Sequence, residues 1–395
     1  MKHVVIAGGG FAGMRLARKL RSQKNTSVTI INSSSDFRYY PALYRAATGF
    51  KLGTARLPLE WMLIDAPRTN LIIDTVTTID PIKKQITISS GQKINYDFAV
   101  MALGSVTTYF NIEGLHEHSY GIKSPDEIVQ LRNHLHGKIA ENTDADENYV
   151  VVGAGPTGVE LAGGLGNYLR HISKKHHVKK HHVKVWLVDA GPRILPQLSD
   201  KAARASQKRL EKVGVTILTN TTVTKETIQS LKTSNGTIKT HTVIWTAGTA
   251  NNPFFKQQSD VFKLNQRGRV EVNKHLQGAD DIYVIGDNAA TQHSGLALTA
   301  VRHANFVAKD IKAQSKRRKR PKNYERSPAQ IVPVGNNWAV LQYKKFTIYG
   351  KIVSLIRKVA DYIGYSDVLG NLKALTIWTS SENTESACRI CSKNN

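Results

Sequence analysis

The chain of 395 residues has only two cysteines, Cys388 and Cys391, and both lie in its polar last stretch. Disulfides therefore cannot hold this fold together, and one CxxC pair without a second pair is a weak metal or redox signal. We expect an inert, reduced tail. No run of 18 apolar residues occurs, which argues against a membrane-spanning helix. Because the first strand is expected to start at His3, it leaves no room for a signal peptide, and we expect a protein that stays on the cytoplasmic side.

Acidic residues are also scarce. Asp and Glu number 30 against 55 Lys and Arg, which gives a formal charge of +25 and a pI near 9.9. Such a protein is drawn to polyanions, either nucleic acid or the anionic face of a membrane. Nine of the basic residues fall within 309–326. The attraction therefore concentrates in the last quarter of the chain, although charge alone does not separate the two partners.

Two glycine motifs of the same form organise the sequence. Residues 4–13, VVIAGGGFAG, and 149–160, YVVVGAGPTGVE, each place GxGxxG directly after a β-branched apolar run. In such a turn the first glycine lets the chain reverse, the second lets the backbone approach a pyrophosphate, and the third lets the helix lie close to the strand. The helix N–H groups then face phosphate. One such motif is weak evidence, but the pair predicts two dinucleotide sites.

The residues that follow the second strand of each unit refine this prediction. Asp189 ends the strand 183–188, where a carboxylate takes both ribose hydroxyls of NAD and repels a 2′-phosphate, so NADH is favoured over NADPH. Asn32 occupies the matching place in the first unit and can bond a ribose hydroxyl without charge, unless it is only a strand-end turn residue. The repeat KKHHVKKHHV at 174–183 is expected to be a solvated loop. Its His177 and His181 lack further ligands, so no metal is expected.

A third strand end carries Gly286 and Asp287. A carboxylate there can reach the ribityl hydroxyls of a flavin bound on the first glycine turn, or it can cap the next helix. Beside two dinucleotide motifs, we favour the flavin.

Together these segments resemble the flavoproteins with two dinucleotide-binding domains, and among them the type II NADH dehydrogenases. The motifs in family order are GGGFAG, PALYRAATG, YDFAVMALGS, GAGPTGVELAGGL, VDAGPRILP, WTAGTANNP and YVIGDNAA. The resemblance implies FAD on the first glycine turn and NADH on the second. The cofactor-binding residues expected are Gly8, Gly10, Phe11, Ala12, Gly13, Asn32, Gly104, Gly153, Gly155, Pro156, Thr157, Gly158, Asp189, Gly248, Gly286 and Asp287.

The resemblance further implies transfer of two electrons from NADH through FAD to a membrane quinone, without proton pumping. Glu160 would lie near the nicotinamide and the flavin, although a glutamate in a first helical turn is also favoured by the helix dipole. Disulfide reductases and sulfide:quinone oxidoreductases need paired cysteines near the flavin, and this chain has none there. Two alternatives stay open: a soluble NADH-dependent reductase of another acceptor, and an interaction flavoprotein similar to apoptosis-inducing factor.

The acceptor site is where the chain departs from the family. Type II NADH dehydrogenases carry Ala-Gln-x-Ala-x-Gln on the helix after the Gly-Asp strand, and the matching residues here are Ala297, Leu298, Ala300 and Arg302. Both amides are missing. We expect Arg302 to polarise a quinone carbonyl in their place, unless quinone is not the acceptor. His303 could supply a proton, or be an ordinary helix-surface histidine.

The predicted fold is α/β, with two Rossmann-like domains and a C-terminal amphipathic region that associates with a membrane. The expected boundaries are 1–115 and 251–325 for the FAD domain, 116–250 for the inserted NADH domain, and 326–395 for the C-terminal region. In the helix expected at 348–363, the apolar face comprises Ile348, Tyr349, Ile352, Val353, Leu355, Ile356, Val359, Ala360 and Ile363, and the polar face comprises Lys351, Ser354, Arg357, Lys358 and Asp361.

This helix suits an anionic leaflet, with Leu372, Leu375, Ile377 and Trp378 extending the contact. Alternatively it covers a core or a dimer seam. We therefore expect a peripheral protein on the cytoplasmic face of the cell membrane, with a homodimer possible. We do not expect nucleic acid as a partner.

Overall fold

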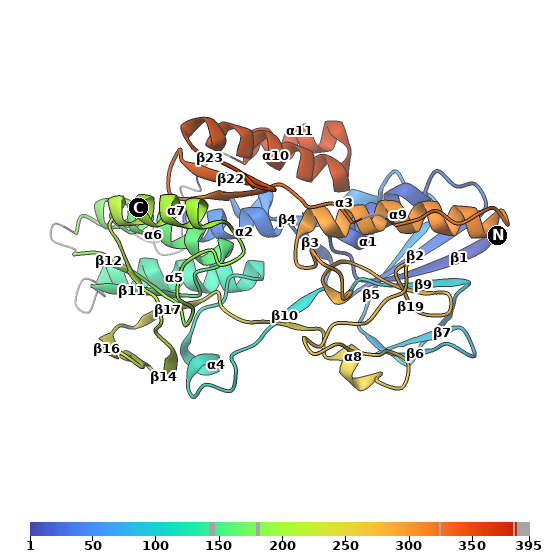
Figure 1. The fold of residues 1–395 in the computed structure, drawn as a ribbon, viewed down its shortest axis with the longest axis horizontal. Coiled ribbons are helices and arrows are strands. Elements are labelled where there is room, and N and C mark those ends of the chain that lie inside the picture. The colour runs from blue at the N-terminus through green and yellow to red at the C-terminus, as the bar shows by residue number, and fades with distance from the viewer. Residues whose placement is uncertain (142–146, 179–181, 324, 382–383, 385–395) are drawn as a thin grey trace.

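The computed structural model describes residues 1–141, 147–178, 182–323, 325–381 and 384. Two mainly parallel sheets form its two halves (Figure 1). The first has six strands in the order β19-β20-β9-β1-β2-β5, with only β19 running antiparallel to its neighbour. Its strands are β1 (Lys2–Ala7), β2 (Thr26–Asn32), β5 (Thr69–Ile73), β9 (Phe98–Met101), β19 (Gln277–Ala279) and β20 (Ile282–Val284).

The second sheet has four parallel strands in the order β13-β12-β11-β17. They are β11 (Asn148–Val152), β12 (Lys184–Val188), β13 (Val215–Leu218) and β17 (Thr242–Trp245). Val150, Val151 and Val152 are buried on both faces, as a central parallel strand requires. The α/β fold with two Rossmann-like sheets is confirmed, while the domain boundaries stay a prediction.

Two of the passages of the chain between the two halves lie side by side. β10 (Ser105–Thr107) leaves the first half and pairs antiparallel with β18 (Thr249–Asn251), which returns from the second. Figure 1 shows β10 between the two halves. Residues from both halves therefore meet at this crossover.

The remaining elements flank these sheets. The helices are α1 (Phe11–Leu20), α2 (Tyr40–Ala47), α3 (Leu59–Leu63), α4 (Leu115–His118), α5 (Pro125–Glu141), α6 (Pro156–Lys175), α7 (Asp200–Lys212), α8 (Phe254–Gln257) and α9 (Ala297–Ser315), with short turns η1 (Leu52–Thr54) and η2 (Gly286–Asn288). The outer strands are β3 (Asp36–Arg38), β4 (Arg56–Pro58), β6 (Val76–Asp80), β7 (Gln85–Ile88), β8 (Lys93–Asn95), β14 (Val223–Thr227), β15 (Ser230–Thr233) and β16 (Gly236–Lys239).

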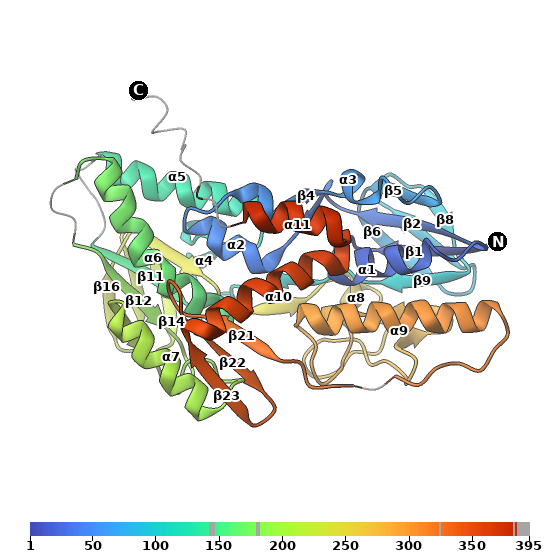
Figure 2. The same ribbon diagram turned by 90° about the horizontal axis from the view of Figure 1, so that it is seen from above.

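The C-terminal region is a three-stranded sheet followed by two helices. Its elements are β21 (Gln330–Pro333), β22 (Ala339–Tyr343), β23 (Phe346–Gly350), α10 (Lys351–Leu369) and α11 (Asn371–Ser380). The predicted start of the amphipathic helix at Ile348 is wrong, because Ile348 pairs with Leu341 in the sheet and the helix begins at Lys351. Figures 1 and 2 show α10 and α11 lying across both halves of the molecule.

Within the described residues, no helix is both long enough and apolar enough to cross a bilayer. Cys388 and Cys391 lie outside the described residues.

Candidate active site

The first glycine turn is a tight backbone cradle between β1 and α1. Gly8 has a φ of +111°, and a methyl group added there would lie 2.1 Å from the carbonyl oxygen of Ala102. A methyl at Gly13 would lie 1.9 Å from the carbonyl oxygen of Gly8, whereas one at Gly10 would meet no atom within 4 Å. Only the middle glycine therefore faces open space, at the N-terminus of α1, as a site for a dinucleotide pyrophosphate requires.

The second turn repeats this geometry between β11 and α6. Gly153 has a φ of +107°, a methyl at Gly158 would lie 1.8 Å from its carbonyl oxygen, and Gly155 faces open space. Pro156 begins the helix and Thr157 is exposed. Both turns fit the pyrophosphate of a dinucleotide.

The two predicted ribose-binding residues occupy equivalent places. The Asn32 Oδ1 atom accepts a hydrogen bond from the backbone N–H of Gly9 at 2.8 Å. The Asp189 Oδ2 atom accepts from the N–H of Ala154 at 2.6 Å, and its Oδ1 atom accepts from Gly191 at 2.7 Å. Each side chain thus lies beside the first glycine of its turn. Because a carboxylate has about four acceptor positions, Asp189 keeps capacity for two ribose hydroxyls.

The crossover carries a buried asparagine that sequence reasoning missed. The Asn288 Oδ1 atom accepts from the N–H of Gly104 at 2.9 Å, and its Nδ2 group donates to the Gly104 carbonyl and to the Asn251 Oδ1 atom at 2.8 and 2.6 Å. Asn288 is fully buried, so these bonds fix the crossing strands. They also hold Asp287 at the crossover, where its Oδ2 atom accepts from the Ser105 hydroxyl at 3.2 Å.

Gly286 brings three predicted site residues together. A methyl added there would lie 3.7 Å from the Cβ atoms of Ala12 and Ala300, so α1 and α9 both approach this turn. The Gly286 N–H donates to the His303 Nδ1 atom at 3.2 Å. Burial lowers the pKa of His303 to about 4. The reading of His303 as a surface histidine is wrong, because its side chain is buried. Its Nδ1 atom accepts a hydrogen bond, and a role in supplying a proton stays a prediction.

Glu160 lies in a charged cluster between α2, α6 and α10. Burial raises its pKa to about 8, against the lowering effect of the Arg357 charge and a hydrogen bond with Tyr44. Glu160 is therefore protonated near neutral pH. Asp361 pairs with Arg357 and with Arg45, the latter at 3.3 Å.

This cluster corrects the predicted polar face of the C-terminal helix. Arg357 and Asp361 point into the protein, and Asp361 is only 2% exposed. The reason is their pairing with α2, which lies more than 300 residues away in sequence and so leaves no local signal. Ile377 and Trp378 are also partly packed against the core, and the Trp378 indole N–H donates to the Lys358 carbonyl at 2.7 Å.

The four predicted quinone-site residues do not share one face of α9. Ala300 packs against Gly286. Leu298 is 38% exposed and lies one helical turn from Arg302, so these two residues share a different face of the helix. The Arg302 guanidinium donates to the Arg326 carbonyl. Arg302 lines a small hollow with Thr291, His293, Thr299, His303, Asn323, Glu325 and Arg326.

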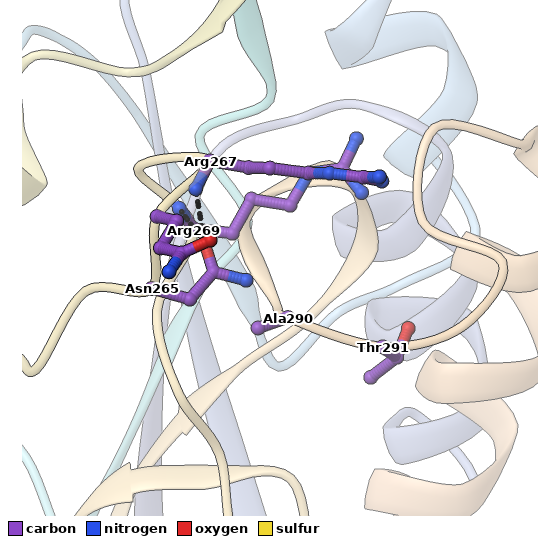
Figure 3. Close-up of a pocket in the computed structure, with 6 residues that line it drawn as sticks. Asn265, Arg267, Arg269, Ala290 and Thr291 are labelled. Atoms are coloured by element: carbon purple, nitrogen blue, oxygen red, sulfur yellow. Dashed lines mark hydrogen bonds between the residues drawn. The ribbon is translucent and has the colours of Figure 1, made fainter.

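A second hollow, of about 310 Å³, also has Thr291 in its lining (Figure 3). Arg267 and Arg269 line it from a tight turn, in which their backbone N–H groups both donate to the Asn265 Oδ1 atom at 3.0 Å. It is lined by Asn265, Gln266, Arg267, Arg269, Ala290 and Thr291, and none of these belongs to a glycine turn.

No group of three or more His, Cys, Asp or Glu side chains in the described part of the chain could hold a metal ion. His181 lies outside that part.

Two glycine turns on two mainly parallel sheets, joined at one crossover, give the fold expected of an oxidoreductase that binds two dinucleotides. Residues 2–304 match the model of the pyridine nucleotide-disulphide oxidoreductase family, and the chain belongs to this family.

Comparison with known proteins shows which members of this family the chain is similar to. The chain is 29% identical to the type II NADH:quinone oxidoreductase Ndh of Mycobacterium tuberculosis, across 95% of this chain and 87% of that protein. It is 28% identical to the type II NADH:quinone oxidoreductase of Staphylococcus aureus, across 79% and 82%. The structure of NDH2 from Plasmodium falciparum in complex with NADH has a TM-score of 0.84 at 16% identity, covering 96% of this chain and 98% of that chain.

The sulfide:quinone oxidoreductase of Aquifex aeolicus has a TM-score of 0.80 at 20% identity, covering 98% of both chains. The resemblance to type II NADH dehydrogenases is confirmed by the names of the relatives. The structural likenesses establish the fold alone.

Proposed function

We propose that the chain is an FAD-dependent oxidoreductase that passes two electrons from NADH to a membrane quinone without pumping protons. The observation that supports this proposal is the pair of open glycine turns, one in each half of a molecule whose halves are joined by the β10–β18 crossover. Similarity over most of the chain to proteins named type II NADH:quinone oxidoreductases supports the choice of donor and acceptor.

The residues divide into two sets. FAD would be held by the first turn together with Asn32, Gly104, Gly286 and Asp287. NADH would be held by the second turn together with Asp189 and Gly248. When bound, FAD would supply the chemistry of hydride acceptance and electron transfer, and the protein would orient the partners and exclude water. Glu160, protonated near neutral pH, holds a proton on its carboxyl group at the boundary between the halves.

At the acceptor site, two side chains of α9 differ from the amides of the family pattern. Leu298 replaces an amide with an apolar side chain, and Arg302 is bonded to Arg326. Arg302 stays the candidate for polarising a quinone carbonyl. The same loss of amides favours a second candidate function, an NADH-dependent reductase of a different acceptor.

Anaerobic mixing tests both functions. The FAD-loaded protein is expected to bleach with stoichiometric NADH and to recover its flavin absorbance on addition of a short-chain quinone. Rapid bleaching with recovery only by another acceptor would move the assignment to the second candidate. A protein that takes up no FAD would overturn both.

Cofactor selectivity is expected to depend on Asp189. Its carboxylate would meet the 2′-phosphate of NADPH at close range, and this like-charge contact costs about 1–3 kcal/mol when partly desolvated. Asp189→Ala is therefore expected to change the NADH/NADPH ratio of kcat/KM by roughly 10-fold to 100-fold. Asp200→Ala removes an exposed acid instead and serves as the control. An unchanged ratio in Asp189→Ala would remove Asp189 from the ribose site.

We also propose that α10 and α11 rest on a membrane surface. Ile352, Leu355, Val359 and Ile363 are 75%, 63%, 56% and 53% exposed, so the apolar side of α10 faces outward while its charged pair faces the protein. Leu372 of α11 and Phe346 of β23 extend this apolar surface, at 85% and 76% exposed. Exposed apolar surface of this kind marks an interaction face. A cytoplasmic location and a homodimer remain predictions.

Vesicle binding tests this surface. The triple variant Ile352→Ser/Leu355→Ser/Val359→Ser is expected to fold normally and to bind anionic vesicles at least about 100-fold more weakly, since each apolar side chain contributes roughly 1.5 kcal/mol or more on burial. A matched double variant, Ile82→Ser/Ile228→Ser, changes exposed apolar residues near the β6–β7 and β14–β15 strands, away from α10 (Figure 1). If both proteins pelleted alike, this face would not be the anchor.

A further inference from the structure

Lys123 lies on the segment that leads from the first half of the molecule into the second. Just before it, the Tyr120 N–H donates to the Val243 carbonyl at 2.8 Å, and the Trp245 N–H donates to the Tyr120 carbonyl at 2.9 Å. These bonds attach the segment to the edge of the second sheet, beside β17. The position of Lys123 is therefore set by the sheet.

The next residues cap α5 and hold the Lys123 backbone. The Glu127 Oε2 atom accepts from the backbone N–H groups of Lys123 and Ser124, and the Ser124 hydroxyl accepts from the Glu127 N–H at 3.2 Å. This reciprocal pattern is a capping box. A methyl group at Gly121 would lie 2.6 Å from the Glu127 carboxyl carbon. The Glu127 carboxylate is thus held by backbone groups and does not form a hydrogen bond with the Lys123 ammonium.

The Lys123 Nζ atom is buried and makes no hydrogen bond with any residue that the structure describes. Lysine side chains normally extend to place this group in water, and a buried, unpaired ammonium is costly. Burial lowers the pKa of Lys123, while the charges of Glu127 and Asp287 oppose that shift. Asp287 is the residue to which we assign the flavin ribityl chain, and its Oδ2 atom already accepts from Ser105.

A partly exposed tyrosine of the other half lies within the electrostatic influence of the same carboxylates. Burial raises the pKa of the Tyr40 hydroxyl, and Asp287 and Glu127 raise it further, while Arg38 opposes them. Tyr40 is 48% exposed at the start of α2. Lys123, Asp287 and Tyr40 therefore border one region next to the crossover, and the buried ammonium is its unsatisfied donor.

We propose that Lys123 contacts the bound flavin and stabilises the negative charge that the ring gains on reduction. The inference rests on the proposed function. A hydride from NADH carries two electrons and one proton, so its transfer leaves NAD⁺ and one added negative charge on a neutral oxidised ring. A buried ammonium with three donors offsets that charge more strongly than it would in water.

The test uses full-length protein loaded with FAD and compares Lys123→Met with Lys123→Arg, which keeps the charge. Sulfite is the probe, because it adds to oxidised flavins and leaves the same negative charge on the ring. In Lys123→Met the sulfite Kd is expected to rise at least tenfold. The two-electron midpoint potential is expected to fall by about 30 mV, which corresponds to the same tenfold change in an equilibrium constant. Lys123→Arg should stay within about threefold of the parent, as should the exposed control Lys83→Met.

Folding gives an independent readout. Because Lys123→Met removes a buried unpaired charge, the apoprotein is expected to be at least as resistant to urea as the parent. An unchanged sulfite Kd and potential in Lys123→Met would overturn the proposal, even if the FAD content fell. Failure of the parent protein to take up FAD would instead overturn the proposed function.

Discussion

A methyl group at Gly10 is expected to weaken FAD binding by more than about 100-fold while leaving the apoprotein folded. The backbone of Gly10 has a φ of −79° and a ψ of −165°, which alanine adopts without strain, and an added methyl meets no protein atom within 4 Å. That methyl would instead occupy the space where the pyrophosphate approaches the backbone. Gly10→Ala therefore separates cofactor binding from folding, measured by FAD titration and by urea denaturation.

Gly155→Ala is the matched variant for the second turn. Gly155 has the same extended backbone, with a φ of −72° and a ψ of −178°, and faces open space in the same way. This protein should retain FAD and lose NADH binding. If Gly10→Ala and Gly155→Ala each impaired both cofactors equally, the division of the two turns between FAD and NADH would be wrong.

Gly13→Ala provides the contrasting control. Its methyl would lie 1.9 Å from the Gly8 carbonyl oxygen, so β1 and α1 would have to separate. We expect an apoprotein that is destabilised by at least about 1–3 kcal/mol, in contrast to Gly10→Ala.

The parts of the site that could be predicted are those whose contacts lie within a single βαβ unit. The glycine turns, Asn32 and Asp189 each lie within a few tens of residues of their partners, and the strand–turn–helix geometry follows from local sequence. Gly286 and Asp287 follow the end of β20 and lie beside the crossover. Their roles in binding cofactors remain predictions.

The parts that could not be predicted depend on contacts between distant segments. The periodicity of α10 separates apolar from polar residues, but it does not say which side faces water. The helix turns its charges inward because Arg45 lies opposite Asp361, and this pairing spans most of the chain. Lys123 was missed for the same reason, since only the fold places its side chain near Asp287. The surface position considered for His303 failed because Gly286 packs against it.

The charged side chains of α10 that point into the protein are expected to contribute strongly to its stability. Asp361 is 2% exposed and is the shared anion of two arginines, Arg357 on its own helix and Arg45 on α2. The Tyr39 hydroxyl also donates to the Asp361 backbone carbonyl, at 3.2 Å, so this point joins α10 to the first half of the molecule. Removing the carboxylate would leave positive charge buried without its counter-ion.

Asp361→Ala is therefore expected to lower the free energy of unfolding by about 3–5 kcal/mol, the cost of breaking a buried ion pair on one side only. Urea denaturation of the apoprotein measures it. The control is Glu271→Ala, which breaks an exposed pair with Lys263, and its effect on stability is expected to be far smaller because water screens exposed ion pairs. The charge of Asp361 also raises the pKa of Glu160, so in Asp361→Asn the Glu160 pKa is expected to fall below its parent value of about 8. Equal stability of Asp361→Ala and Glu271→Ala would mean that α10 is not held to the protein by this charge cluster, and that its contacts through buried Tyr365 and Val368 suffice.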